Sequence, residues 1–133
     1  MSARGIASAL FALGLAACAT TLPPSVRVAD ISALAGTYSG RLKEVSQLSR
    51  SARLVVQPNG NFELTASEPR GFRTLGVMVL EPDGTLKYLY NESKGEGKVL
   101  SGKGVVHEGD GRRVLVLTHD DGLQTMTVSR SLP

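Results

Sequence analysis

Residues 52–66 decide the fold of this chain, and they read Ala-Arg-Leu-Val-Val-Gln-Pro-Asn-Gly-Asn-Phe-Glu-Leu-Thr-Ala. Apolar and polar residues alternate on both sides of the central Pro-Asn-Gly, which is typical of strands with one buried face and one wet face. The Asn-Gly pair tolerates the positive φ angles that tight hairpin turns require. The stretch therefore predicts a β-hairpin.

The same pattern continues outward from this hairpin, with turn signals at residues 81–84, 108–111 and 120–122. The segments between these turns leave no room for crossover helices, so successive strands are expected to pair antiparallel. Closing such a meander removes its exposed edges. We predict an all-β fold, a small eight-stranded antiparallel up-and-down barrel, with a β-sandwich as the alternative. The expected strands lie near residues 36–45, 52–57, 61–67, 72–80, 85–91, 97–107, 113–119 and 123–130.

The N-terminus carries an apolar run over residues 5–17, preceded by Arg4. A membrane-spanning helix needs about twenty residues, so this shorter run is typical of an export signal. It ends in Leu15-Ala16-Ala17-Cys18, which resembles the lipobox of bacterial lipoproteins. The resemblance predicts a lipoprotein.

In that family the signal peptidase recognises the three residues that correspond to Leu15, Ala16 and Ala17. It cuts before the cysteine, here Cys18, which carries a diacylglyceryl thioether and usually an N-acyl chain. Ala19, in place of an aspartate, implies passage to the outer membrane and a domain that faces the periplasm. The expected organisation is a removed signal peptide (1–17), a lipidated flexible tether (18–30) and a β-barrel domain (31–133). Cys18 is the only cysteine, so no disulfide is expected.

Residues 30–38, Asp-Ile-Ser-Ala-Leu-Ala-Gly-Thr-Tyr, resemble the opening of lipocalin-like barrels, where a helical turn leads into Gly-x-Trp. Tyr38 stands at the position of the tryptophan. Asp30 is expected to cap a single helical turn. The resemblance implies a barrel, and short strands favour an interior filled by side chains, with a deep cavity as the alternative.

Two segments, 75–80 and 114–117, are apolar on both faces. One face of a barrel strand points inward, so the other must be covered or remain as an apolar patch. Residues 26–35 folding back over these strands would cover them. The alternative is a surface for a partner protein, a second copy or an apolar ligand, with the candidate residues Leu75, Val77, Val79, Leu115 and Leu117.

Several chemical functions are not expected. The formal net charge is +3 with both signs interspersed, which does not favour nucleic-acid binding. Residues 97–104 nearly match a phosphate-binding loop, but Gly104 replaces the hydroxyl residue and a strand follows, so the glycines are interpreted as barrel bends. His107 and His119 lack a third metal ligand. We expect no catalytic residue, no metal and no cofactor, and hence no enzyme.

The leading expectation is an outer-membrane-anchored lipoprotein whose barrel is a non-enzymatic binding or envelope-scaffolding module. One alternative is a periplasmic inhibitor of a lysozyme or protease, acting through a loop such as 67–71 or 91–96. The other alternative is a carrier of a small apolar ligand. The expected partners are the membrane, through the lipid on Cys18, and an envelope protein.

Overall fold

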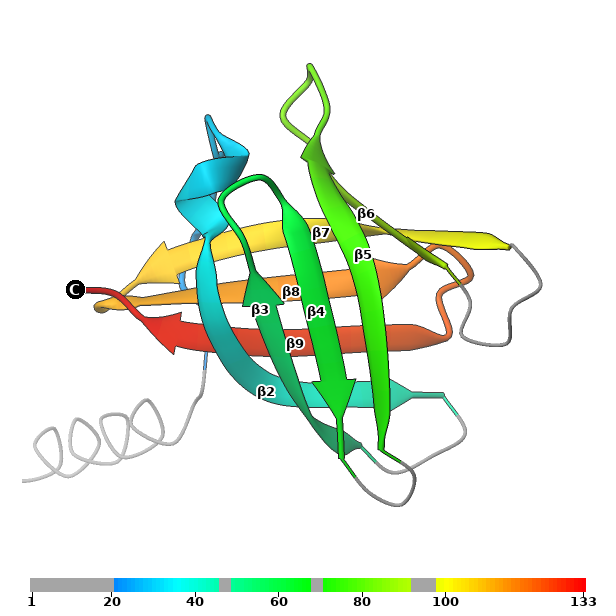
Figure 1. The fold of residues 1–133 in the computed structure, drawn as a ribbon. Coiled ribbons are helices and arrows are strands. Elements are labelled where there is room, and N and C mark those ends of the chain that lie inside the picture. The colour runs from blue at the N-terminus through cyan, green and yellow to red at the C-terminus, as the bar shows by residue number, and fades with distance from the viewer. Residues whose placement is uncertain (1–20, 46–48, 68–70, 92–97) are drawn as a thin grey trace, which may run out of the picture.

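The computed structural model is a closed antiparallel β-barrel, and it describes residues 21–45, 49–67, 71–91 and 98–133 (Figure 1). Eight strands, β2 to β9, pair in chain order, and the pairing of β2 with β9 closes the barrel. This confirms the predicted up-and-down barrel over the sandwich alternative, with one additional short strand. The elements are β1 (Ser25–Val26), the 3₁₀ helix η1 (Ile31–Leu34), β2 (Gly36–Glu44), β3 (Arg50–Val56), β4 (Asn61–Ala66), β5 (Phe72–Leu80), β6 (Leu86–Asn91), β7 (Val99–Gly109), β8 (Arg112–His119) and β9 (Gln124–Ser131).

The hairpin predicted for residues 52–66 forms between β3 and β4, with Val56 opposite Phe62 and Ala52 opposite Ala66. Its turn places Gly60 at φ 93°, in the left-handed region that glycine enters without strain. Asn59 accepts a hydrogen bond from the Asn61 amide at 3.0 Å, the local bond that favours Asn in turns. The three other predicted turns also form, each with a positive-φ glycine, at Gly84, Gly111 and Gly122.

One end of the barrel is closed by η1. Asp30 caps this helical turn as predicted, because its carboxylate accepts a hydrogen bond from the Ser32 amide at 3.0 Å. Leu34 is fully buried, and its carbonyl accepts a hydrogen bond from the buried Tyr38 hydroxyl at 2.8 Å. The Arg130 guanidinium lies over the Tyr38 ring, 5.8 Å from its centroid. This layer excludes water from the closed end.

The chain before η1 lies against the outside of the barrel. Strand β6 begins at Leu86, opposite Gly104, so β7 extends beyond it and β1 pairs with the next stretch of β7. The Glu108 amide donates a hydrogen bond to the Pro24 carbonyl at 3.1 Å. His107 Nδ1 lies 3.0 Å from the Pro23 carbonyl oxygen. Within the predicted tether of residues 18–30, residues 23–26 therefore lie along the barrel, because an incomplete sheet edge offers them hydrogen-bond partners.

The barrel interior is filled by one apolar cluster drawn from η1 and all eight barrel strands, as expected for short strands. Nearly every inward position of β2, β3 and β4 is apolar, as the alternation predicts. Among the described residues there is no helix of the length and hydropathy needed to cross a bilayer.

Candidate functional site: the barrel mouth

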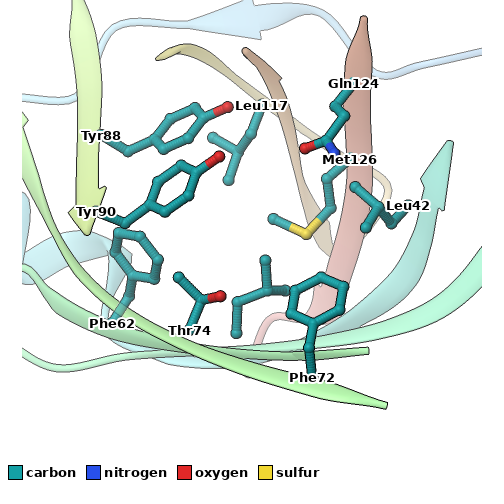
Figure 2. A pocket seen from close by; sticks show the side chains of 10 residues that line it. Leu42, Phe62, Phe72, Thr74, Tyr88, Tyr90, Leu117, Gln124 and Met126 are labelled. Carbon is teal, nitrogen blue, oxygen red and sulfur yellow. The ribbon is translucent and has the colours of Figure 1, made fainter. Parts of the chain in front are cut away.

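An apolar pocket with an internal volume of about 50 Å³ lies within the barrel, and Figure 2 shows side chains that line it. Its lining residue Leu42 is near the end of β2 that is remote from η1, so the pocket lies at the end of the barrel opposite η1. Because alternate residues point inward, the last inward side chains of several strands meet at this end, which is here called the mouth. The pocket lining comes from β2, β4, β5, β6, β8 and β9. It consists of Leu42, Phe62, Leu64, Phe72, Thr74, Tyr88, Tyr90, Leu117, Gln124 and Met126.

Two tyrosines form one wall of the pocket. The rings of Tyr88 and Tyr90 are nearly parallel, with centroids 6.1 Å apart and planes at 10°. Phe62 meets Tyr88 edge to face at 6.4 Å, and His119 meets Tyr90 in the same way at 6.1 Å. Burial raises the pKa of the Tyr88 hydroxyl, and the nearby Tyr90, Asp120 and Asp121 raise it further. Tyr88 is therefore a neutral hydrogen-bond donor and acceptor at physiological pH.

The absence of a side chain at Gly102 leaves the space that the Tyr88 ring occupies. Gly102 is buried directly across from Tyr88 on β7, and a Cβ at Gly102 would lie 2.3 Å from the ring. Gly104, two residues further along, similarly leaves room for Leu86 and Leu117. Both glycines lie within a regular strand, so they are positions of close side-chain approach rather than parts of a phosphate loop.

Polar groups stand at the rim of the pocket. Glu44 forms an ion pair with Arg50 at 3.2 Å and accepts a hydrogen bond from the Gln124 amide at 3.5 Å. The Arg50 guanidinium also lies 5.7 Å from the centroid of Phe72. On the other side of the mouth, His119 Nδ1 lies 2.9 Å from Asp121 Oδ1. The arrangement offers a small apolar interior with hydrogen-bonding groups above it.

The predicted surface residues separate into two groups. Leu75 and Val79 point outward on β5 and are 58% and 43% exposed, and Val77, between them, is half-buried. The surface prediction is wrong for Leu115 and Leu117, which point into the barrel and are 0% and 3% exposed. The physical reason is the phase of the alternation, which a segment that is apolar on both faces does not reveal.

Val114 points outward on β8 and is nevertheless covered. It is 2% exposed, and residues Thr21 and Leu22 lie with it around a hollow on the outside of β8 and β9. The chain before β1 therefore covers Val114. This arrangement is similar to the expected one, in which residues 26–35 fold back over the strand. The covering residues come from earlier in the chain than predicted.

The two histidines lie far apart along the shared β7–β8 ladder. His107 on β7 is opposite Val114, whereas His119 on β8 is opposite Gly102. No group of three or more His, Cys, Asp or Glu side chains suited to a metal occurs among the described residues.

Other predicted sites fall outside the described residues. These are the lipidation residue Cys18, the signal-peptidase residues Leu15, Ala16 and Ala17, and the greater part of the candidate inhibitory loops, at 68–70 and 92–96.

Sequence reasoning missed most of the pocket lining. It paired Tyr88 with Tyr90 on one face, but it did not place Leu42, Phe72 and Gln124 beside them. The available signal was positional: these residues occupy inward positions at strand ends that an up-and-down barrel brings to the same end.

In comparisons with known proteins, no family model, no curated protein and no solved structure matches this chain. Small β-barrels support many unrelated functions, so the fold by itself assigns none. Function has to be inferred from the side chains at the mouth and on the outer faces of the barrel.

Proposed function

We propose that this chain is a non-enzymatic binding protein, anchored to the bacterial outer membrane through a lipid on Cys18, whose barrel mouth binds a slender apolar group. The observation that carries the binding proposal is the contrast between the two ends. One end is sealed by η1 and Tyr38, and the other holds an apolar pocket beneath polar groups. A ligand with an apolar end and a polar end fits this gradient.

The size of the pocket limits the ligand. A cavity of roughly 150 Å³ accepts a benzene ring, and the pocket at the mouth is about 50 Å³. The group that enters is therefore thinner than an aromatic ring, and the end of an alkyl chain meets this condition. Phe62, Phe72 and Met126 would supply the apolar contacts.

The rim would orient the polar end of the ligand. The Tyr88 and Tyr90 hydroxyls and the Gln124 amide lie around the pocket, and each can donate or accept a hydrogen bond (Figure 2). No nucleophile paired with a base lines the pocket among the described residues, which supports binding rather than catalysis.

Native mass spectrometry tests this proposal on the full chain, extracted gently from its own envelope. The expected spectrum shows an amphiphilic small molecule bound in addition to the acyl groups on Cys18. Thr74→Met should abolish the bound mass, because the flexible methionine side chain fills the pocket from within. A ligand mass that survives Thr74→Met would contradict binding at the mouth.

Thr118→Met is the matched control. It makes the same chemical change at an exposed, outward position of β8, and it should leave the bound mass unchanged. A wild-type spectrum with no mass beyond the acylated chain, in detergents that preserve other lipid complexes, would also count against the proposal.

The anchor has its own test. Cys18→Ser removes the only sulfur that can accept the diacylglyceryl group, so we expect an uncleaved and unlipidated precursor. Electrophoretic mobility and intact mass measure both changes. Normal processing of this variant would refute the lipobox assignment.

A second candidate function is the docking of a protein partner on the apolar outer face of β5. The observation that favours it is the exposure of Leu75 and Val79 on either side of Val77. Leu75→Lys and Val79→Lys should abolish partner capture in a pull-down from envelope extracts while leaving the unfolding midpoint nearly unchanged. Retained capture would remove this candidate.

A further inference from the structure

Strands β9, β2 and β3 are neighbours in the barrel (Figure 1). The exposed outward residues of these strands are mainly hydroxyl and basic residues. Across the three strands, Ser39 lies between Ser129 and Arg53, and Arg41 lies between Thr127 and Ser51. Directly opposed residues have Cβ atoms about 5 Å apart. This surface is called the cationic face and is defined by Ser39, Arg41, Lys43, Ser51, Arg53 and Thr127.

The charge of the cationic face is not neutralised within the face. Among the described outward residues of β9, β2 and β3 none is acidic. Arg41 donates its hydrogen bonds to the hydroxyl and carbonyl oxygens of Ser49, both at 3.0 Å, rather than to a carboxylate. Glu63, on the adjacent strand β4, is bonded to Arg73 at 3.0 Å and also interacts electrostatically with Arg53. Three cations and several hydroxyl groups therefore lie together on the face, with Glu63 at its edge.

The chain enters the barrel beside this face. Thr21 and Leu22 line a hollow together with Ser39, Thr127 and Ser129. An extended chain advances about 3.5 Å per residue, so Cys18 lies within about 11 Å of Thr21. A lipid on Cys18 would bring this side of the barrel to the membrane surface, because the chain before Thr21 is too short to let the domain stand clear.

We propose that the cationic face lies against a bilayer with anionic phospholipid headgroups. This inference rests on the Cys18 anchor of the proposed function. An anionic bilayer surface attracts Lys and Arg side chains, and guanidinium and hydroxyl groups donate hydrogen bonds to phosphate oxygens. The anchor and the cationic face thus act together, the first holding the domain at the membrane and the second choosing which side faces it.

The proposal leaves other surfaces free of the membrane. Strand β6 is opposite β2 in the closed eight-strand order, and the exposed Leu75 and Val79 lie on the neighbouring strand β5. The side of the barrel that carries β5 and β6 would face away from the bilayer, accessible to soluble molecules.

Fluorescence quenching measures which face meets the membrane. Cys18 is the only cysteine, and its sulfur is blocked when acylated, so Ser51→Cys introduces a single labelling site on the cationic face. Lys87→Cys introduces the matched site on β6. The labelled full-length lipoprotein is reconstituted into phosphatidylcholine vesicles, with or without phosphatidylglycerol, that carry a headgroup quencher.

We expect strong quenching at position 51 in vesicles with phosphatidylglycerol, weakened by added salt, and little quenching at position 87. Equal quenching at the two positions would overturn the proposal. So would quenching at position 51 that does not depend on phosphatidylglycerol, because charge would then not select the face.

Charge variants give a second measurement. Arg41→Gln with Arg53→Gln should lower the ratio of docked to undocked domain about 25-fold, at about fivefold for each charge removed. Lys87→Gln with Lys103→Gln removes two charges on the opposite side of the barrel and should leave the ratio unchanged. Equal effects of the two pairs would indicate a general charge effect and would contradict a docking face.

Two different measurements test the lipid anchor and the docking face separately. The intact mass of the membrane-extracted chain reports the acyl groups on Cys18 directly. A chain without acyl groups would remove both the anchor and the inference that rests on it. An acylated chain whose two labels are quenched equally would remove only the docking face.

Discussion

At Gly102 the lack of a side chain decides where a tyrosine ring can lie. Tyr88 packs directly over this glycine, in the position that a Cβ would occupy. The alternation around residues 86–90 predicts that Tyr88 points inward, but only the register of β6 with β7 shows which residue it meets. The glycine that resembled part of a phosphate loop is a packing position for the pocket wall.

Gly102→Ala should destabilise the barrel by about 1–3 kcal/mol, because the added methyl group forces the Tyr88 ring out of its place. Urea unfolding monitored by circular dichroism measures the effect. In a double-mutant cycle with Tyr88→Leu the penalty should shrink, since the smaller side chain leaves room. An equal penalty in both backgrounds would mean that the ring is not the cause.

Tyr38 seals the closed end through its hydroxyl as well as its ring. Its hydroxyl donates to the Leu34 carbonyl at 2.8 Å in a fully buried setting. The same hydroxyl accepts a longer hydrogen bond from Arg113, at 3.4 Å. Tyr38→Phe should cost about 1–2 kcal/mol of unfolding free energy, because both hydrogen bonds are lost while the ring and its contact with Arg130 remain. Urea unfolding measures this cost, and an unchanged midpoint would show that the two hydrogen bonds contribute nothing net.

Two strands with similar composition, β5 and β8, illustrate the limits of pattern reading at the level of elements. Both contain apolar residues on consecutive positions, and the sequence predicts an apolar surface on each. On β5 the odd-numbered apolar residues point outward, whereas on β8 they point inward. The outward positions of β8 include Val114, which the chain around Leu22 covers.

Two leucine truncations test this difference between the strands. Leu115→Ala should cost about 2–5 kcal/mol, because it opens a cavity in the core. Leu75→Ala should change stability by no more than about 0.5 kcal/mol, because its side chain is largely exposed. Chemical denaturation of the two variants measures both values, and similar costs would contradict the assigned directions.

Closure makes the barrel one cooperative unit at the scale of the whole molecule. The β2–β9 ladder joins the first and last strands of the meander, so that every strand from β2 to β9 is paired on both sides. Strand β1 is different, since it has two residues and pairs only with β7. The eight barrel strands are therefore expected to unfold together, whereas β1 is expected to detach from β7 by local opening.

Hydrogen exchange on the full chain measures this hierarchy. The slowest amides of β2, β3 and β9 should exchange with one common free energy, equal to that of global unfolding, while those around β1 exchange by local opening at lower cost. Exchange of β9 at a free energy well below that of β3 would show that the β2–β9 seam opens independently.

The sequence by itself determined the all-β class, the eight barrel strands to within two residues at each end, the turns and the capped helical turn at Asp30. These features depend on neighbours in the chain, on alternation of period two and on the backbone freedom of glycine and asparagine. The pocket at the mouth, the inward direction of Leu115 and Leu117, and the cationic face were decided by the tertiary structure. Each depends on the phase and register of strands that lie far apart in the chain. Alternation of period two separates the residues of a strand into two faces, but it does not show which face points into the core.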